Sequence, residues 1–149
     1  MGRKPNWHQG EYKPKNPDKY VGDKLPKFKS GWENRFMIFC DTHPSVISWA
    51  YEPIQIPYTH PLKKDAKGRK KQSIYVPDFL ISYRDKHGNK HVEMIEIKPK
   101  SQTVLTEKST LKERSDVAVN TAKWREAQKW CRHRDIKFRI LTKEEIFVK

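Results

Sequence analysis

Two acidic residues and a lysine interrupt a long, largely apolar stretch of the sequence, Tyr75 to Lys100. Asp78 lies inside the first apolar run, and Glu96 and Lys98 lie inside the second. A buried carboxylate is costly unless a hydrogen bond, a cation or a metal ion neutralises it. Two carboxylates and a lysine held together are suited to binding a divalent metal and hydrolysing a phosphodiester bond. The sequence therefore predicts a metal-dependent hydrolytic site in this stretch.

Each residue of the predicted site has an expected role. Asp78 and Glu96 supply the carboxylates that Mg²⁺ prefers, and the backbone carbonyl of Ile97 adds a neutral ligand; Mn²⁺ is an expected substitute for Mg²⁺. Lys98 either orients or deprotonates the attacking water or holds the scissile phosphate, and the sequence does not separate these roles. The alternative is an ion pair of Glu96 and Lys98 on an edge strand, with Asp78 at a strand end. We disfavour it because neither run has the polar face typical of an edge strand.

A β-hairpin is the element that must position these side chains. Its predicted turn, Asp85 to Asn89 (DKHGN), has the Asp, Gly and Asn typical of a short loop. If pairing is centred on His87, Asp78 lies opposite Glu96, because each is nine residues away from it. Opposed residues share one face, with Cβ atoms about 4.5–5.5 Å apart, and strand alternation places Lys98 on the same face. A slip of one residue would send the two acids to opposite faces.

A predicted helix from Ser30 to about Thr42 precedes the hairpin. Ser30 and Glu33 have capping-box spacing, which is a structural explanation for the glutamate. Glu33 also begins a stripe with helical spacing that faces the predicted sheet and continues through Phe36, Met37 and Cys40. We therefore favour Glu33 as a fourth catalytic residue, as a metal or metal-water ligand, over a role in capping alone.

Charge and composition indicate a polyanionic partner. The 149 residues, enough for one domain, contain 32 Lys and Arg against 18 Asp and Glu, a formal net charge of +14.

Cys40 and Cys131 fall in predicted helices outside any CxxC pair, so we expect reduced core thiols. The sequence shows no apolar run of membrane-spanning length and no signal-peptide pattern at its start, so we expect a protein of a reducing cytoplasm, or one packed into a particle made there.

Two basic segments are candidate nucleic-acid contacts. Residues 1–29 are predicted to form an extended basic arm before a domain at 30–149; its aromatics either stack on bases or anchor the arm to its own domain. His60 to Gln72 is predicted to be an exposed basic loop suited to a phosphate backbone, with a solvated hairpin tip as the alternative. The predicted nucleic-acid contacts are Lys63, Lys64, Lys67, Arg69, Lys70, Lys71, Lys100, Asn120 and Lys123.

The remaining pattern predicts further elements. Val46 to Tyr58 is expected to be a strand pair or a bent strand that ends at Pro57, and Ser101 to Ser115 a loop. A helix from Asp116 to Arg134 has an inward stripe of Asn120, Trp124, Ala127 and Cys131. On it, Asn120 and Lys123 are within reach of a phosphate, although we favour a helix-surface pair. Ile136 to Leu141 alternates as a last strand, and Thr142 to Glu145 starts a short terminal helix.

At this point the sequence resembles a known group of proteins. Pro77-Asp78 and Glu96 to Lys98 (EIK) resemble the PD-(D/E)xK motif of restriction-endonuclease-like nucleases. A longer set of segments is similar to the head-completion nucleases of tailed phages, which are in turn similar to the N-terminal catalytic part of the transposon endonuclease TnsA. These segments are Lys15–Asp23 (KNPDKYVGD), Ser30–Glu33 (SGWE), Glu96–Lys100 (EIKPK), Asn120–Trp124 (NTAKW) and Lys137–Thr142 (KFRILT).

The resemblance implies an α/β restriction-endonuclease-like core, a mixed sheet flanked by helices, and Mg²⁺-dependent DNA cleavage without a small-molecule cofactor. It also implies a role at the filled phage head, on packaged DNA ends and near head or portal proteins, in the virion or the infected cell's cytoplasm. The implied active-site set is Glu33, Asp78, Glu96 and Lys98. Two alternatives remain, a non-enzymatic basic virion protein that closes or stabilises the head, and an RNA-binding protein of ribosomal type.

Overall fold

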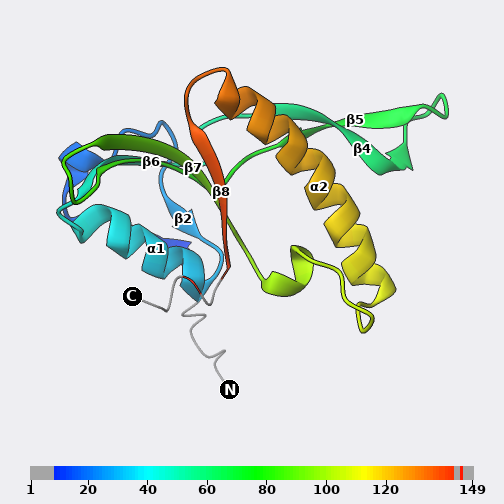
Figure 1. The fold of residues 1–149 in the computed structure, drawn as a ribbon, viewed down its shortest axis with the longest axis horizontal. Coiled ribbons are helices and arrows are strands. Elements are labelled where there is room, and N and C mark those ends of the chain that lie inside the picture. Colours follow the sequence, from blue (N-terminus) through cyan, green and yellow to red (C-terminus); the bar gives the residue numbers. More distant parts are fainter. Residues whose placement is uncertain (1–8, 143–144, 146–149) are drawn as a thin grey trace.

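A mixed four-stranded sheet carries the predicted hairpin at its centre (Figure 1). The computed structural model describes residues 9–142 and 145. The strand order is β3 (Val46–Tyr51), β6 (Phe79–Arg84), β7 (Lys90–Lys98) and β8 (Lys137–Thr142). The first three strands are antiparallel neighbours, and β8 runs parallel to β7. With the helices described next, this confirms the predicted α/β class with a restriction-endonuclease-like core.

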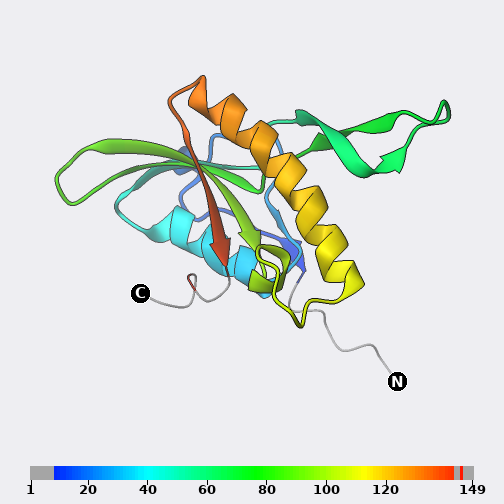
Figure 2. The same ribbon diagram turned by 45° about the vertical axis from the view of Figure 1, so that its right-hand side comes forward.

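One helix covers each face of the sheet (Figures 1 and 2). Helix α1 (Gly31–Thr42) packs over a core that includes Leu141, whereas α2 (Leu111–Arg132) packs over a second core that Ile140 contacts. Neighbouring residues of β8 therefore serve opposite faces, as strand alternation requires. The inward stripe predicted for the second helix is confirmed, since the buried residues of α2 are Asn120, Trp124, Ala127 and Cys131.

The central hairpin has the predicted register. Phe79 pairs with Ile95 and Arg84 with Lys90, so β6 and β7 are symmetric about His87. The Asp85 carboxylate fixes the turn by accepting the N–H groups of His87 at 2.8 Å and Asn89 at 3.0 Å. Gly88 has φ +81°, a conformation that glycine adopts without a steric penalty.

A second, two-stranded sheet corrects two predictions. Val46 to Tyr58 is neither a strand pair nor one bent strand, because β4 (Ile56–Lys64) pairs with β5 (Lys70–Tyr75) rather than with β3. Pro57 lies inside β4, which is tolerated because a two-stranded ribbon has only edge strands. The predicted basic loop is mostly strand, with residues 65–69 as its turn, which confirms the alternative of an exposed hairpin tip. Figures 1 and 2 show this hairpin projecting from the rest of the molecule.

The start of α2 was also predicted wrongly. The helix begins at Leu111, inside the segment expected to be a loop, and ends at Arg132. Thr110 caps it by accepting the N–H of Glu113 at 3.1 Å, and the Glu113 carboxylate accepts the N–H of Thr110 at 2.9 Å. This capping box stabilises a polar first turn that has too few apolar residues to show a helical period. A short 3₁₀ helix, η2 (Lys100–Gln102), precedes it.

The described part of the N-terminal segment packs against its own domain. Strand β1 (Gly10–Glu11) pairs with β2 (Lys27–Phe28), and η1 (Pro17–Lys19) lies between them. The rings of Tyr12 and Tyr20 lie 6.0 and 4.7 Å from that of Trp49. Of the two predicted alternatives, anchoring to the domain is the one these aromatics show, whereas Trp7 lies outside the described residues.

Other predictions have simple outcomes. Both cysteines are buried and free. Among the residues that the structure describes, no helix is long and apolar enough to cross a membrane. The short helix predicted after Thr142 falls mostly on residues outside the described ones.

Candidate active site

The hairpin brings Asp78 next to the end of β7. Asp78 directly precedes β6, and the register extended by one residue places it opposite Glu96, as predicted. The backbone N–H of Ile97 donates to Asp78 Oδ2 at 2.8 Å, which fixes this carboxylate against the strand.

Both carboxylate oxygens of Glu96 have partners. Tyr75, the last residue of β5, donates its hydroxyl to Glu96 Oε1 at 2.8 Å. Lys98 Nζ lies 3.4 Å from Oε2 on the same face of β7, as strand alternation predicted. Glu96 itself is buried, with 3% of its surface exposed. The carboxylate is therefore held in one orientation by a neutral donor on one side and a cation on the other.

The two central acids have raised pKa values. Burial, followed by the charge of Glu96, raises the pKa of Asp78 well above its usual range, while the Ile97 N–H acts in the opposite direction. Burial also raises the pKa of Glu96, although Lys98 and the Tyr75 hydroxyl lower it in part. The positive charge of Lys98 is therefore not enough to offset the burial of two carboxylates. A site of this kind favours an additional cation.

Glu33 takes part in capping α1 and also lies near enough to Glu96 to respond to its charge. Its backbone N–H donates to Ser30 Oγ at 3.2 Å, and the Ser30 hydroxyl lies 3.3 Å from Glu33 Oε1. Burial raises the pKa of Glu33, and the charge of Glu96 adds to that rise. The capping bond is thus present, and the carboxylate also lies within electrostatic range of the hairpin acids.

The carboxylates of this site fit magnesium by their chemistry. Within residues 9–142 and 145, no three His, Cys, Asp or Glu side chains are grouped as a metal site. The candidate donors are therefore the carboxylates of Asp78 and Glu96 and the backbone carbonyl of Ile97. Mg²⁺ commonly uses one or two protein carboxylates and completes its shell with water and phosphate oxygens. A site with a buried carboxylate, Glu96, and a half-buried one, Asp78, both incompletely neutralised, suits it.

A cleft with a volume of about 500 Å³ opens beside Lys98. Its walls come from the outer half of β4, from η2 and from α2. It brings together four of the predicted site residues, Lys63, Lys98, Asn120 and Lys123. The other predicted contacts are exposed, Lys100 on η2 and Lys64, Lys67, Arg69, Lys70 and Lys71 on the projecting hairpin.

The two helix residues in this cleft differ in their surroundings. Asn120 is buried and donates from Nδ2 to the carbonyl of Gln102 at 3.1 Å, which ties α2 to η2. The Lys123 ammonium lies 5.9 and 5.8 Å from the ring centroids of Tyr58 and Tyr75. Burial, and then the charge of Lys98, lowers the pKa of Lys123. Asn120 therefore has a structural contact, and Lys123 supplies a second cation near Lys98.

Tyr75 is the site residue that sequence analysis missed. It orients Glu96 through its hydroxyl and lies beneath the Lys123 ammonium. Its type and position gave no signal beyond an aromatic residue at the start of an apolar run. Pairing of β5 with β4 places it here, and the prediction did not pair these strands because it made His60 to Gln72, between them, a loop.

Comparisons with known proteins identify the family of the chain. Residues 43–143 match the family described as TnsA-like endonuclease N terminal, a range that contains Asp78, Glu96 and Lys98. The chain is also similar to the head completion nuclease of Enterobacteria phage T4, with 36% identity over 148 residues that cover 92% of each chain. The family match spans more than half of the chain, and this relative extends the similarity over almost all of it. The chain therefore belongs to the TnsA-like N-terminal endonuclease family.

Proposed function

We propose that this protein is a Mg²⁺-dependent endonuclease that hydrolyses DNA phosphodiester bonds at Asp78, Glu96 and Lys98. The observation that carries the proposal is the pair of carboxylates with raised pKa values beside a lysine, in a chain of an endonuclease family. The net charge of +14 supports a nucleic-acid substrate.

The chain's own residues would hold the ion and orient the reactants. Asp78 and Glu96 would bind it through their carboxylates. The carbonyl of Ile97 would join them, because N–H and C=O of one strand residue point to the same side and this N–H faces Asp78. Bound Mg²⁺ lowers the pKa of a water and stabilises charge on the phosphate. Glu33, which begins α1, would contact a metal-bound water or a second ion.

Lys98 and Tyr75 would complete the site. The Tyr75 hydroxyl keeps one oxygen of Glu96 occupied, so that the carboxylate cannot rotate freely. Lys98 extends from the same face of β7 into the cleft, where its ammonium could orient or deprotonate the attacking water or hold the scissile phosphate. Lys123 adds positive charge on the opposite wall.

The β4–β5 hairpin and the cleft together suggest a path for DNA. The hairpin carries Lys64, Lys67, Arg69, Lys70 and Lys71 at and beyond the end of β4, and the neighbouring Lys63 lines the cleft. A two-stranded ribbon fits the major groove of B-form DNA, and its lysines suit the flanking phosphates. We propose that the hairpin holds the duplex through backbone contacts, with little dependence on sequence.

The similarity to the T4 head completion nuclease extends the proposal to a biological setting. We propose that this protein acts in completing a phage head, on DNA ends near head or portal proteins, in the virion or the cytoplasm of the infected cell. The chemistry does not depend on this setting and is tested separately.

Plasmid nicking tests the enzymatic proposal. Supercoiled plasmid is incubated with the native chain in Mg²⁺, in Mn²⁺ and in EDTA, and with Asp78→Asn and Asp18→Asn in Mg²⁺. We expect nicking by the native chain in both metals, none in EDTA, and a loss of at least about 100-fold for Asp78→Asn, the scale expected when metal-assisted stabilisation of the transition state is lost. Asp18 is exposed and lies outside the candidate site. Asp18→Asn therefore removes the same charge elsewhere, and its nicking rate should match that of the native chain.

A contrary result has a definite meaning. Tight DNA binding without nicking in either metal would favour the alternative of a non-enzymatic basic virion protein. Nicking that survives in EDTA would remove the metal from the mechanism. An equal loss of nicking in Asp78→Asn and Asp18→Asn would show that the activity does not depend on the proposed site.

A further inference from the structure

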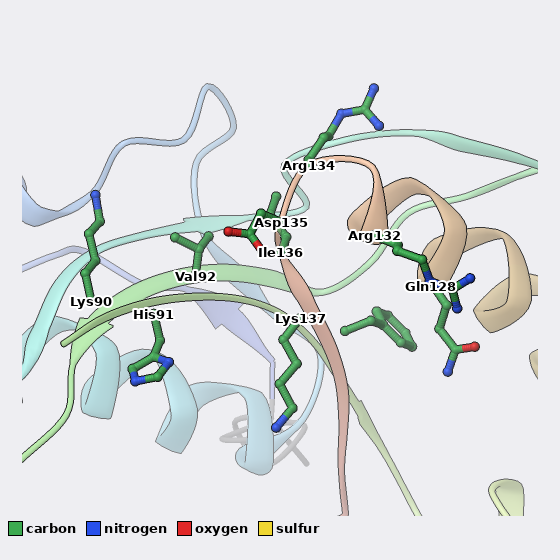
Figure 3. Close-up of a pocket in the computed structure, with 10 residues that line it drawn as sticks. Lys90, His91, Val92, Gln128, Arg132, Arg134, Asp135, Ile136 and Lys137 are labelled. Carbon is green, nitrogen blue, oxygen red and sulfur yellow. The ribbon is translucent and has the colours of Figure 1, made fainter.

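A second cleft lies at the end of the sheet remote from Asp78 and Glu96 (Figure 3). Its volume is about 850 Å³, and its walls come from the start of β7, the last turns of α2 and the start of β8. Lys90 and Lys98 stand at opposite ends of β7, which at about 3.3 Å per residue separates them by about 26 Å. This cleft is therefore distinct from the candidate active site.

Positive charge dominates the second cleft. Its lining contains Lys90, Arg132, Arg134 and Lys137, against the single carboxylate of Asp135. Figure 3 shows these side chains coming from separate segments around it. In the part of the chain that the structure describes, none of the four cations forms an ion pair with an acid. The cleft is therefore a concentration of uncompensated charge.

The surrounding contacts hold this charge in place. Arg134 stacks 3.9 Å over the ring of Trp130 and donates to the Trp130 carbonyl at 3.0 Å. Asp135 has φ +55°, which turns the chain sharply from α2 into β8 and brings Lys137 close to the helix end. A non-glycine residue in this region is strained, and such strain is often retained where a functional surface requires it. Arg132, Arg134 and Lys137 thus lie at or beside one defined turn, and Lys90 comes from the start of β7.

The composition of the cleft favours phosphate over a protein partner. Protein interfaces are enriched in aromatic residues and depleted in lysine, whereas here the four cations outnumber the three apolar side chains. Lys and Arg that approach from different elements suit successive phosphates of a nucleic-acid backbone. We propose that this cleft binds a second stretch of DNA backbone, remote from the one that is cut. The inference rests on the proposed function in taking DNA as the polyanion.

Two contact regions at opposite ends of one sheet have a functional consequence. A chain that holds DNA at both ends would remain attached to a long or densely packed duplex while its active site acts on one strand. Each site would also add its own phosphate contacts to the salt dependence of binding, at a log–log slope of about −0.9 per phosphate.

The salt dependence of binding tests the inference. The full-length chain in EDTA is titrated with a duplex several helical turns long, over a series of salt concentrations. We expect Arg132→Ala/Lys137→Ala to weaken binding and to reduce the slope by up to about 1.8, since two phosphate contacts are lost. The conservative pair Arg132→Lys/Lys137→Arg should keep the native slope, because both charges remain.

A charge-matched control separates this cleft from net charge. Lys13→Ala/Lys27→Ala removes two exposed lysines from the N-terminal segment and should leave the slope within error of the native value. An unchanged slope in Arg132→Ala/Lys137→Ala, or an equal fall in both alanine pairs, would overturn the inference. The first result would leave an acidic protein surface as the partner to be sought. Metal-dependent nicking by the native chain alongside either result would show that only this inference, not the proposed activity, had failed.

Discussion

The raised pKa values of half-buried Asp78 and buried Glu96 have an energetic consequence that does not depend on any activity. An acid whose pKa is raised in the folded state keeps its proton there at a pH where the unfolded chain has lost it. Stability therefore falls as pH rises from the ordinary pKa of Asp, 3.8, toward the raised value of Asp78, and stays lower above it. A cation bound between the two carboxylates would reverse that loss.

We therefore expect Asp78→Asn to stabilise the metal-free protein. At pH 8 in EDTA we expect the melting temperature of Asp78→Asn to exceed that of the native chain. In a domain of this size, each kcal/mol of added stability raises the melting temperature by about 2–4 °C. Below the ordinary pKa the difference should vanish, because both chains are then neutral at this position. Mg²⁺ or Mn²⁺ should raise the melting temperature of the native chain more than that of the variant. Thermal melts at pH 8 and at a pH below 3.8, with and without metal, measure these differences in melting temperature.

A lower melting temperature for Asp78→Asn at pH 8 would show that the Ile97 N–H bond outweighs the repulsion. Asp18→Asn again serves as the control, since it changes an exposed carboxylate and should behave like the native chain at both pH values.

Single residues differ in how far the sequence determines their place. Asp78, Glu96 and Lys98 were predictable because one turn, identified by its Asp, Gly and Asn, determines the register of both strands. Tyr75 was not, because its contact with Glu96 depends on the pairing of β4 with β5. The strands of that hairpin are mostly polar and exposed toward their turn, so they show no apolar alternation in the sequence.

At the scale of elements, the β4–β5 hairpin was the least predictable. Strands are recognised by alternating apolar residues, but the outer half of this ribbon has no core to pack against, so its residues are mostly polar. The first turn of α2 is also polar and shows no apolar period. Its capping box of Thr110 and Glu113, however, was a local signal that could have been found. The buried elements, α1, β6, β7 and β8, were predictable because each has a face that packs.

The hairpin also has a testable role as an element. Lys67→Ala/Lys70→Ala/Lys71→Ala removes three exposed cations from its outer half without touching the cleft. We expect the log–log salt slope of DNA binding to fall by up to about 2.7, from three lost phosphate contacts. In the nicking assay the loss should fall on KM rather than on kcat, because the catalytic groups are unaltered.

The matched control is Lys13→Ala/Lys15→Ala/Lys27→Ala, which removes the same charge from the N-terminal segment. An equal effect of the two triple variants on the slope would mean that the hairpin contributes only net charge. A loss confined to kcat would instead indicate that the hairpin acts on the active site.

At the scale of the whole molecule, the N-terminal segment is part of the folded unit as far as it is described. Asp41, at the end of α1, is buried and accepts hydrogen bonds from the Tyr12 hydroxyl at 2.6 Å and from the N–H groups of Lys15 at 2.7 Å and Asn16 at 2.9 Å. The segment therefore packs its aromatics against Trp49 and attaches its backbone to one carboxylate. Sequence alone left this open, because basic and aromatic residues suit a DNA-binding arm equally well.

The attachment to Asp41 predicts a second pH dependence, of opposite sign to that of Asp78. Burial alone would raise the pKa of Asp41, but the hydrogen bonds from Tyr12, Lys15 and Asn16 lower it below 3.8. A depressed pKa contributes stability that is present above 3.8 and is lost as pH falls through the folded value. The Asp41 carboxylate should therefore hold the segment most firmly at neutral pH.

We expect Asp41→Asn to release the N-terminal segment at neutral pH, because an amide cannot accept from all three donors and brings an N–H₂ group among them. The loss of hydrogen bonds to a charged acceptor, each contributing about 1.5–3 kcal/mol, should lower the melting temperature and expose Lys15 and Lys19 to trypsin, which does not cut after Lys13 because Pro14 follows it. Limited proteolysis with mass spectrometry detects those cuts, and Asp18→Asn, on the same segment, controls for charge. Unchanged protection at these lysines would mean that the packing of Tyr12 and Tyr20 on Trp49 is enough to hold the segment. In that case stability should also lack the acid-side decline that the depressed pKa of Asp41 predicts.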